Sequence, residues 1–258
     1  MTDAPDTRDA TPILREGAVA LVTGASAGIG AATAEALVAR GCRVIGAARG
    51  RAALEALGAR LGPSFHAHLL DVTDAPAVAR LLDDLPAGLR EIDILINNAG
   101  HDAGGRRRLD LGAVEGWAAI IDTNVTGMVR VTHAVAPGMV ARRRGHIVNL
   151  GSIAGLRAYP GGAIYAASKF AVRGFGDALR MDYAEHGIRV SEVLPGTART
   201  EFALRRWAGD AARAEAFYDG YPDLLTAEDV ARCVIFALDQ PPDVTIAKIV
   251  VIPRSQAI

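Results

Sequence analysis

The feature that most constrains the fold is a series of short, continuous apolar runs separated by segments long enough to form helices. Each run is rich in Val, Ile or Leu and lacks the alternation of apolar and polar residues that a half-exposed strand shows. Such runs are typical of a parallel sheet that helices cover on both faces. Seven of them occur, at residues 18–22, 43–48, 66–70, 92–96, 146–150, 189–194 and 248–252.

The segments between the runs support the same architecture. Residues 31–40 and 165–186 have helical patterns, and each is followed by a glycine, Gly41 or Gly187, the residue that often closes a helix. The repeated order of strand, helix and strand predicts an α/β fold of the Rossmann type, a doubly wound sheet of about seven parallel strands with helices on both faces. Residues 199–223, between the sixth run and the last helix, are expected to form a lid or cap.

The length fits one domain. The chain has 258 residues, half of them hydrophobic, which is enough to build a large core. No repeat and no low-complexity linker marks a boundary. We therefore expect a single domain over residues 15–258, preceded by a flexible tail of residues 1–14.

Charge and cysteine content argue against several classes of protein. The 28 Lys and Arg residues nearly balance the 29 Asp and Glu residues, and the net charge of -1 lacks the basic field of a nucleic-acid-binding protein. Cys42 and Cys233, the two cysteines, have no spacing typical of a metal site or a disulfide framework. No segment has the length of a signal-peptide core or a membrane span. We expect a cytoplasmic protein without a metal that binds neither nucleic acid nor a membrane.

A glycine-rich turn follows the first apolar run. Residues 23–30 read TGASAGIG, and Gly24, Gly28 and Gly30 allow a sharp turn and a close approach of phosphate to the start of the next helix. Free N–H groups and the helix dipole favour anions there. The spacing differs from both the GxGxxG fingerprint and the P-loop. The alternative is an ordinary tight turn between a strand and a helix.

The end of the second run bears on which dinucleotide would bind. A carboxylate there binds the 2′-hydroxyl of NAD, whereas an arginine accommodates the 2′-phosphate of NADP. The chain carries Arg49 and Arg51 and no carboxylate at this point, which favours NADP; the alternative is that both are solvated residues at a helix start. Asp71, after the third run, can accept a hydrogen bond from the adenine amino group or cap the next helix, although Asp74 is the better-placed cap.

Candidate catalytic residues follow the fifth run. Tyr165 and Lys169 lie at i and i+4, on one face of the predicted helix and about 6 Å apart at Cβ. A neighbouring ammonium favours the phenolate, so we expect it to lower the tyrosine pKa toward neutral pH. Ser152, at the end of the run, can donate a hydrogen bond to a substrate oxygen. Such Tyr–Lys pairs are usually surface residues, but here Lys169 is one of only two lysines.

Together these motifs resemble the short-chain dehydrogenase/reductase family in its single-domain form. The matching segments, in the family's order and approximate spacing between Gly17 and Ile252, are the glycine turn, NNAG at 97–100, Ser152, YxxxK at 165–169 and PG at 195–196. The resemblance implies that Tyr165 is the general acid/base, that Ser152 polarises the carbonyl, and that Lys169 holds the nicotinamide ribose. Asn124 matches the asparagine that keeps a water-linked proton relay in place.

The resemblance also implies the cofactor contacts and the assembly. Residues 15–258 would form a dinucleotide-binding catalytic domain that uses NADP(H), and four copies would form a homotetramer, as is usual in the family. The residues expected to contact the cofactor are Gly24, Ser26, Gly28, Ile29, Gly30, Arg49, Asp71, Val72, Asn98, Ala99, Gly100, Tyr165, Lys169, Pro195, Gly196 and Thr200.

Within the family, the chain is most similar to the NADP-dependent 3-hydroxy acid (serine or allo-threonine) dehydrogenase group. We therefore expect it to interconvert a carbonyl and an alcohol on a small polar substrate. Two alternatives are a 3-oxoacyl-thioester reductase and, from another class, a catalytically silent nucleotide-binding sensor. The intact set of Ser152, Tyr165, Lys169 and Asn124 argues against the sensor.

Two segments near the expected substrate site, 101–108 and 156–159, depart from the pattern of that group and leave the substrate open. Their arginines suggest a clamp for an anionic substrate group, since a guanidinium suits a carboxylate or a sulfonate; the alternative is a solvated basic loop. The candidates are Arg106, Arg107, Arg108 and Arg157, with Arg157 favoured. His101 is expected to shape the pocket wall.

Overall fold

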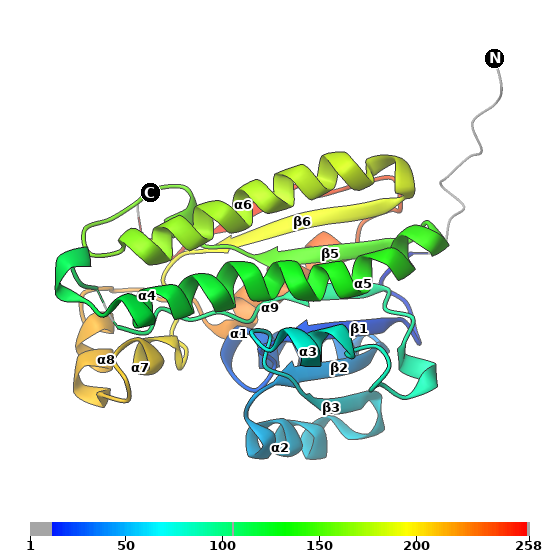
Figure 1. The fold of residues 1–258 in the computed structure, drawn as a ribbon, viewed down its shortest axis with the longest axis horizontal. Helices are drawn as coiled ribbons and strands as arrows, with labels where there is room; N and C mark the ends of the chain where they lie inside the picture. The colour runs from blue at the N-terminus through cyan, green and yellow to red at the C-terminus, as the bar shows by residue number, and fades with distance from the viewer. Residues whose placement is uncertain (1–11, 105, 257–258) are drawn as a thin grey trace.

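The seven apolar runs form one parallel sheet in a computed structural model that describes residues 12–104 and 106–256 (Figure 1). The strand order is β3-β2-β1-β4-β5-β6-β7, and every neighbouring pair is parallel. The strands are β1 (Val19–Thr23), β2 (Arg43–Ala48), β3 (Phe65–Leu69), β4 (Ile94–Asn97), β5 (Gly145–Leu150), β6 (Ile188–Pro195) and β7 (Lys248–Val251). The predicted fold class is confirmed, and each predicted strand end lies within two residues of the observed one.

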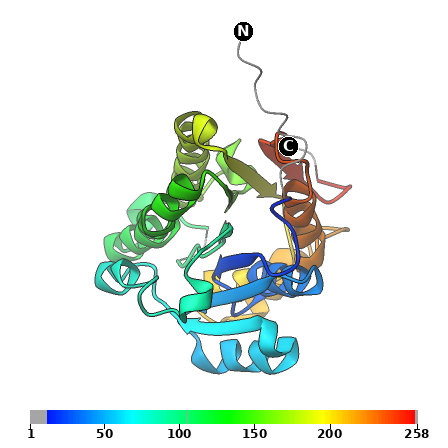
Figure 2. The same ribbon diagram turned by 90° about the vertical axis from the view of Figure 1, so that its right-hand side faces the viewer.

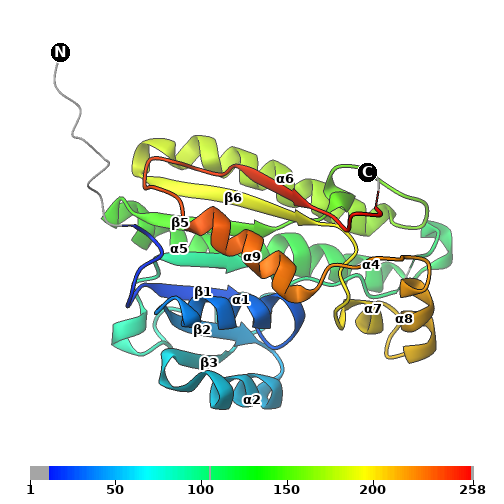
Figure 3. The same cartoon turned by 180° about the vertical axis from the view of Figure 1, so that it is seen from behind.

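Helices cover both faces of this sheet (Figures 2 and 3). The helices of the described residues are α1 (Gly28–Ala39), α2 (Arg51–Leu61), α3 (Ala75–Ala79), α4 (Val114–Ile121), α5 (Met128–Arg142), α6 (Ala163–Tyr183), α7 (Phe202–Arg206), α8 (Ala211–Tyr218) and α9 (Ala227–Leu238). Apolar side chains of α1, α2 and α9 pack on one face, and those of α3, α5 and α6 pack on the other. None of these helices is long and apolar enough to cross a membrane.

Burial along the strands explains why the apolar runs are continuous. Every residue of β1, β4, β5 and β6 is buried, since helices lie above and below them. The edge strands β3 and β7 instead expose alternate residues.

The end of the predicted flexible tail needs correction. Residues 1–11 lie outside the described residues, but Ile13 and Leu14 are buried in the core beside Cys42. Ile13 and Leu14 are therefore part of the packed core, so the predicted tail boundary at residue 14 lies too far along the chain. The predicted cap of α3 is confirmed, since the Asp74 carboxylate accepts a hydrogen bond from the Ala77 N–H.

The predicted lid segment, 199–223, contains α7 and α8 and lies beyond the carboxyl ends of the strands (Figure 1). It reaches the turn between β1 and α1, where a Cβ added to Gly28 would lie 3.3 Å from Thr200 Cβ. The segment is therefore placed to cover the sheet edge at which the glycine turn opens.

The glycines of that turn have different structural tasks. Gly24 and Gly28 have left-handed backbones, with φ of 66° and 54°. A Cβ on Gly30 would lie 2.3 Å from the Gly24 carbonyl oxygen and 2.5 Å from Asn98 Nδ2, so no side chain fits there. Gly24 and Gly28 thus form the turn, and Gly30 lets α1 pack against it.

Substitution of Gly30 by Ala is expected to destabilise the protein by about 1–3 kcal/mol, because the added methyl group must push apart two rigid backbone segments. Gly116→Ala is the matched control, since a Cβ on that α4 glycine meets nothing within 4 Å. Denaturant unfolding of both variants measures the difference. A Gly30→Ala protein as stable as the control would contradict this account of the turn.

Candidate active site

A large cavity lies at the carboxyl ends of the strands, the usual place for a ligand in an open α/β sheet. It has a volume of about 1260 Å³ and runs from the glycine turn, past the ends of β2 and β3, to β5, β6 and α7. Every residue predicted to contact the cofactor lines this cavity except Gly30, and every predicted catalytic residue lines it except Asn124. Segments far apart in the sequence therefore meet in one site.

Hydrogen bonds from asparagines hold the strand ends at this cavity. Asn98 Nδ2 donates to the carbonyl oxygens of Thr23 and Gly24 at 2.9 and 3.2 Å, which ties β4 to β1. Asn97 Nδ2 donates to Asn149 Oδ1 at 2.9 Å, which ties β4 to β5. These bonds match the expectation that asparagines after the fourth run join neighbouring strand ends.

The two arginines after β2 have different environments. Arg49 lines the cavity, where its exposed guanidinium lies 3.7 Å from Asp71 Oδ2. Arg51 is the first residue of α2 and pairs with Glu55 on the solvent side. The solvated helix-start alternative therefore describes Arg51, and Arg49 alone is placed to meet a ligand.

Tyr165 and Lys169 lie on the buried face of α6, not on the molecular surface. Lys169 Nζ donates a hydrogen bond of 2.7 Å to the Leu150 carbonyl at the end of β5. It lies 5.8 Å from the centre of the Tyr165 ring. The sheet therefore holds the ammonium beside the phenol inside the cavity.

Burial dominates the protonation of both side chains. Burial raises the pKa of Tyr165 above its ordinary value of 10, and the nearby positive charge of Arg206 offsets only part of that rise. Burial lowers the pKa of Lys169 to about 8, against the opposing effect of Glu192. The expected shift of the Tyr165 pKa toward neutral pH is not found in the chain by itself, because burial raises this pKa more than the neighbouring positive charge and the hydrogen bond from Ser152 lower it. The phenol keeps its proton at neutral pH.

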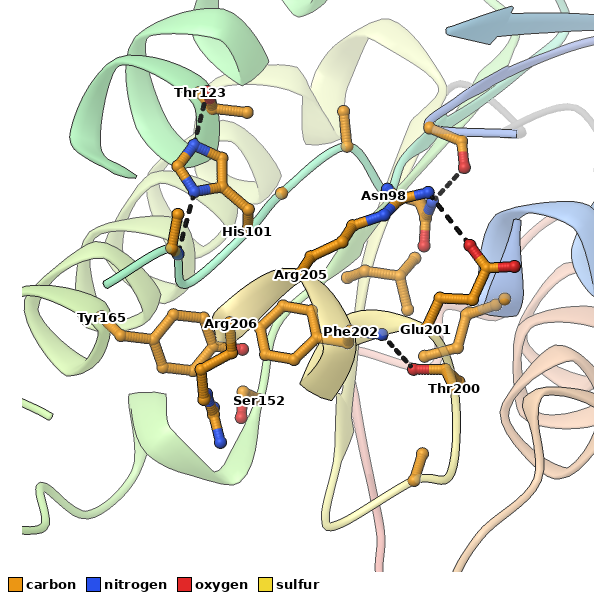
Figure 4. A pocket seen from close by; sticks show the side chains of 18 of the residues that line it. Asn98, His101, Thr123, Ser152, Tyr165, Thr200, Glu201, Phe202, Arg205 and Arg206 are labelled. Atoms are coloured by element: carbon orange, nitrogen blue, oxygen red, sulfur yellow. Dashed lines mark hydrogen bonds and ion pairs between the residues drawn. The ribbon is translucent and has the colours of Figure 1, made fainter. Parts of the chain in front are cut away.

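Ser152 faces the same part of the cavity, from the end of β5 (Figure 4). Its hydroxyl accepts a hydrogen bond from the Ala154 N–H at 3.1 Å. It is also close enough to the Tyr165 hydroxyl to lower the pKa of that phenol by hydrogen bonding. Ser152 and Tyr165 can therefore share one substrate oxygen.

Asn124 acts behind the cavity wall. It is buried in a π-helical stretch, Asp122–Gly127, between α4 and α5. Its Oδ1 accepts from the His101 N–H, and its Nδ2 donates to the His101 carbonyl and to Ser168 Oγ, all within 3.0 Å. Asn124 therefore joins the loop after β4 to α6, next to Lys169.

His101 forms part of the cavity wall, as predicted. Its imidazole Nε2 lies 3.1 Å from Thr123 Oγ1, and its Nδ1 accepts a hydrogen bond from the Ala103 N–H (Figure 4). Burial lowers the pKa of His101, so the ring is neutral at pH 7.

The predicted arginine clamp is only partly at the cavity. Arg106 and Arg157 line it, and both are exposed. Arg107 donates instead to the Leu111 carbonyl, and Arg108 pairs with Asp110. These two belong to a solvated basic loop, the alternative considered for the segment.

Sequence reasoning missed Arg206 at the end of α7. This arginine is buried, lines the cavity and forms an ion pair with Asp102. No local pattern distinguishes it among the arginines of the chain. The available signal for Arg206 was Asp102, the acidic residue within the unusual 101–108 segment. A carboxylate that becomes buried needs a positively charged side chain from another part of the chain.

Comparison with known proteins agrees with the site. A family model described as short chain dehydrogenase matches residues 18–210. Serine 3-dehydrogenase of Agrobacterium fabrum is 38% identical over 92% of this chain and 94% of its own length. The NADP-dependent 3-hydroxy acid dehydrogenase YdfG of Salmonella typhi is 40% identical over 93% of this chain and 96% of its own.

A solved structure, the closed form of serine dehydrogenase complexed with NADP+, superposes with a TM-score of 0.90. It is 39% identical and covers 93% of this chain and 96% of that one. The family resemblance in the sequence is thus confirmed, as is the likeness to the 3-hydroxy acid dehydrogenase group. The chain belongs to the short-chain dehydrogenase family.

Proposed function

We propose that the protein is an NADP(H)-dependent oxidoreductase that interconverts a carbonyl and an alcohol on a small polar substrate of the 3-hydroxy acid or aldehyde type. The observation that carries this proposal is the buried Tyr165–Lys169 pair, which shares one cavity with Ser152 and the glycine turn. The names of the related serine and 3-hydroxy acid dehydrogenases support the reaction class.

The cavity residues fit a nicotinamide dinucleotide. Gly24 and Gly28 present bare backbone at the start of α1, where a diphosphate is stabilised by free N–H groups. The Arg49 guanidinium suits the 2′-phosphate of NADP, because its 3.7 Å separation from Asp71 leaves its donors available. Lys169 lies where it can hold the nicotinamide ribose. When bound, the reduced cofactor supplies the hydride.

Asp71 and Val72 are proposed to contact the adenine end, and Asn98 to Gly100 the ribose beside the nicotinamide. Residues 195–197 and Thr200 would lie along the nicotinamide itself. All of them line the cavity.

The side chains of the site can donate a proton to the substrate oxygen and accept one from it. The protonated Tyr165 phenol is a general acid for a carbonyl oxygen that becomes an alcohol, and Ser152 stabilises the negative charge that develops there. In the reverse direction, the Lys169 ammonium stabilises the phenolate that accepts the alcohol proton. We propose that Asn124, through its bonds to Ser168 and the loop at His101, keeps the water-linked path for that proton in place.

Tyr165→Phe keeps the ring and removes the transferable proton. We expect kcat for NADPH-dependent aldehyde reduction to fall by at least ~10²-fold, with NADPH affinity nearly unchanged. Tyr183→Phe is the control, since that tyrosine lies at the end of α6 and does not line the cavity. Retention of wild-type kcat by Tyr165→Phe would remove the phenol from the mechanism.

Arg49→Ala tests the choice of cofactor. Loss of a charge-assisted contact to the 2′-phosphate is expected to weaken NADPH binding about tenfold and to leave NADH binding unchanged. Arg51→Ala, which removes the neighbouring arginine outside the cavity, is expected to change neither. Fluorescence titration measures the affinities of the wild-type protein and of both variants for NADPH and for NADH. Equal affinity of the wild-type protein for NADPH and NADH would contradict the proposal.

We also propose a homotetramer. Apolar side chains are exposed on α4, α6, α9 and β7, and burying them against other copies would remove them from water. They include Val114, Phe170, Met181, Phe236 and Val250. Light scattering is expected to give the mass of four chains, and the mass of one chain would exclude this assembly.

A further inference from the structure

Glu192 is an unusual residue of the sheet because it places a carboxyl group inside a buried strand. It lies in β6, every residue of which is buried, and it is 2% exposed. Among the described residues, no group hydrogen-bonds either oxygen of its carboxyl. Since a buried carboxylate without a partner destabilises a fold, the presence of Glu192 needs an explanation other than stability.

The side chain of Glu192 faces α6. Alternate residues of a strand point to the same face of a sheet, and Val190, two residues before Glu192, packs in the core cluster on the α6 side. The helix itself runs alongside β6 (Figures 1 and 3). Lys169, Arg173 and Asp177 follow one another at intervals of four on α6, so they lie near one another on the helix. The carboxyl therefore lies against a row of charged side chains that begins at Lys169.

The carboxyl also lies beside the end of β5 that anchors Lys169. A Cβ added to Gly151 would lie 3.1 Å from the Glu192 Cδ and would overlap the carboxyl oxygen Oε1. The residue before this glycine, Leu150, accepts the 2.7 Å hydrogen bond from Lys169 Nζ, and the residue after it is Ser152. A glycine at this position thus makes room for an acid next to the lysine and the serine of the site.

Other charged side chains face Glu192 from α6 and β7. Lys248 is its neighbour on β7 and donates a 2.7 Å hydrogen bond to Asp177 of α6. This half-exposed pair acts on the pKa of Glu192 in two directions, since Lys248 lowers it and Asp177 raises it. Arg173, which is half-buried, also lowers the pKa of Glu192, and Asn149, the neighbour on β5, is uncharged. These groups leave the carboxyl without an ion pair of its own.

The surroundings of Lys169 are simpler. Its side chain is buried, its hydrogen bond goes to an uncharged carbonyl, and Glu192 is the acid whose charge opposes the effect of burial. Burial lowers the pKa of Lys169 to about 8 and raises that of Glu192 to about 7. The carboxylate therefore forms just below the pH range in which the ammonium loses its proton. Between these values, each charge stabilises the other.

Glu192 can reach the reaction only through Lys169. Lys169 and Tyr165 line the cavity, whereas Glu192 does not, so a ligand meets the ammonium and the phenol but not the carboxylate. The Lys169 Nζ lies 5.8 Å from the centre of the Tyr165 ring. An ammonium at this distance stabilises a phenolate, and an uncharged amine does so far less. The charge of Glu192 therefore bears on the proton that Tyr165 transfers.

We propose that Glu192 is a positioning residue of the active site, whose buried carboxylate is the counter-charge that keeps Lys169 an ammonium while Tyr165 exchanges its proton with the substrate. This role rests on the proposed function and concerns the protonation of the same site. It accounts for an acid in a strand that is buried along its whole length.

The protonation of Lys169 can be measured directly, because Lys169 and Lys248 are the only lysines of the chain. Lysine labelled with carbon-13 at Cε gives two NMR signals, and Lys248→Arg identifies the one from Lys169. Its titration midpoint is expected near pH 8 in the wild-type protein. Glu192→Gln and Glu192→Met remove the charge at similar size and are expected to lower this midpoint by about one pH unit, a tenfold lower ratio of ammonium to amine.

Two further variants control the titration. Glu192→Asp keeps the charge on a shorter side chain and is expected to restore most of the Lys169 midpoint. Asp182→Asn removes an exposed acid from α6, the helix that carries Lys169, and is expected to leave the midpoint unchanged. Denaturant unfolding shows that each variant is folded, and the use of two neutral variants separates the loss of charge from the effect of a buried amide.

The pH dependence of activity gives a second readout. With NADPH and glycolaldehyde, kcat of Glu192→Gln is expected to be close to the wild-type value at pH 6.5. At pH 8.5 it is expected to be about tenfold lower than the wild-type value, because Lys169 of the variant is then an uncharged amine. A merely structural role would lower kcat by the same factor at both pH values.

Three results would overturn this role of Glu192. Both neutral variants could keep the wild-type midpoint of Lys169, or kcat could fall equally at the two pH values. A wild-type midpoint near the ordinary value of 10.5 would also overturn it, because the ammonium then needs no counter-charge. Since the titration requires no turnover, a wild-type protein that reduces no aldehyde would contradict the proposed function, and the titration would still decide whether Glu192 keeps Lys169 charged.

Discussion

A phenol and an ammonium buried side by side at the carboxyl end of a parallel sheet determine much of what surrounds them. Neither group is easily removed from water in its charged form, and burial shifts the pKa of each toward the neutral species. The Leu150 carbonyl accepts a hydrogen bond from Lys169, and the charge of Glu192 favours the ammonium. The end of β5 thus supplies both the partner of Lys169 and, through Ser152, the second polar group of the site.

The cavity divides into two ends with different physical character. At the glycine turn, bare backbone and the start of α1 suit phosphate, and Arg49 remains close to solvent. At the other end, α7 brings Phe202 and Arg206 over Tyr165 from a segment far along the chain. Water screens the buried charge of Arg206 at that end less than it screens the exposed arginines of the cavity.

The sequence allowed most of the fold to be predicted, because continuous apolar runs and helix-ending glycines are local signals. The same holds for Tyr165, Lys169 and Ser152, whose spacing places them at one sheet edge. Other features depend on tertiary context. Burial of Ile13 and Leu14 requires a core built from later segments, and the high pKa of Tyr165 follows from desolvation that no spacing reveals.

Arg206 shows most clearly which features could not be predicted from the sequence. Its partner Asp102 is distant in the sequence, and neither residue lies in a motif with a recognisable period. Arg206 is buried and Arg157 is exposed. The burial of Arg206 arises only when α7 packs beside the loop after β4. Nearly all basic residues of the chain are arginines, so the composition does not indicate which of them is buried.

The most direct test of the central claim is a crystal structure of the protein with NADP+ and a substrate-like alcohol. The account predicts that the Tyr165 hydroxyl and Ser152 Oγ lie within hydrogen-bond distance of the same ligand oxygen, with Lys169 Nζ on the adjoining ribose. A ligand oxygen bound elsewhere in the cavity, with the phenol of Tyr165 turned away from it, would contradict the account.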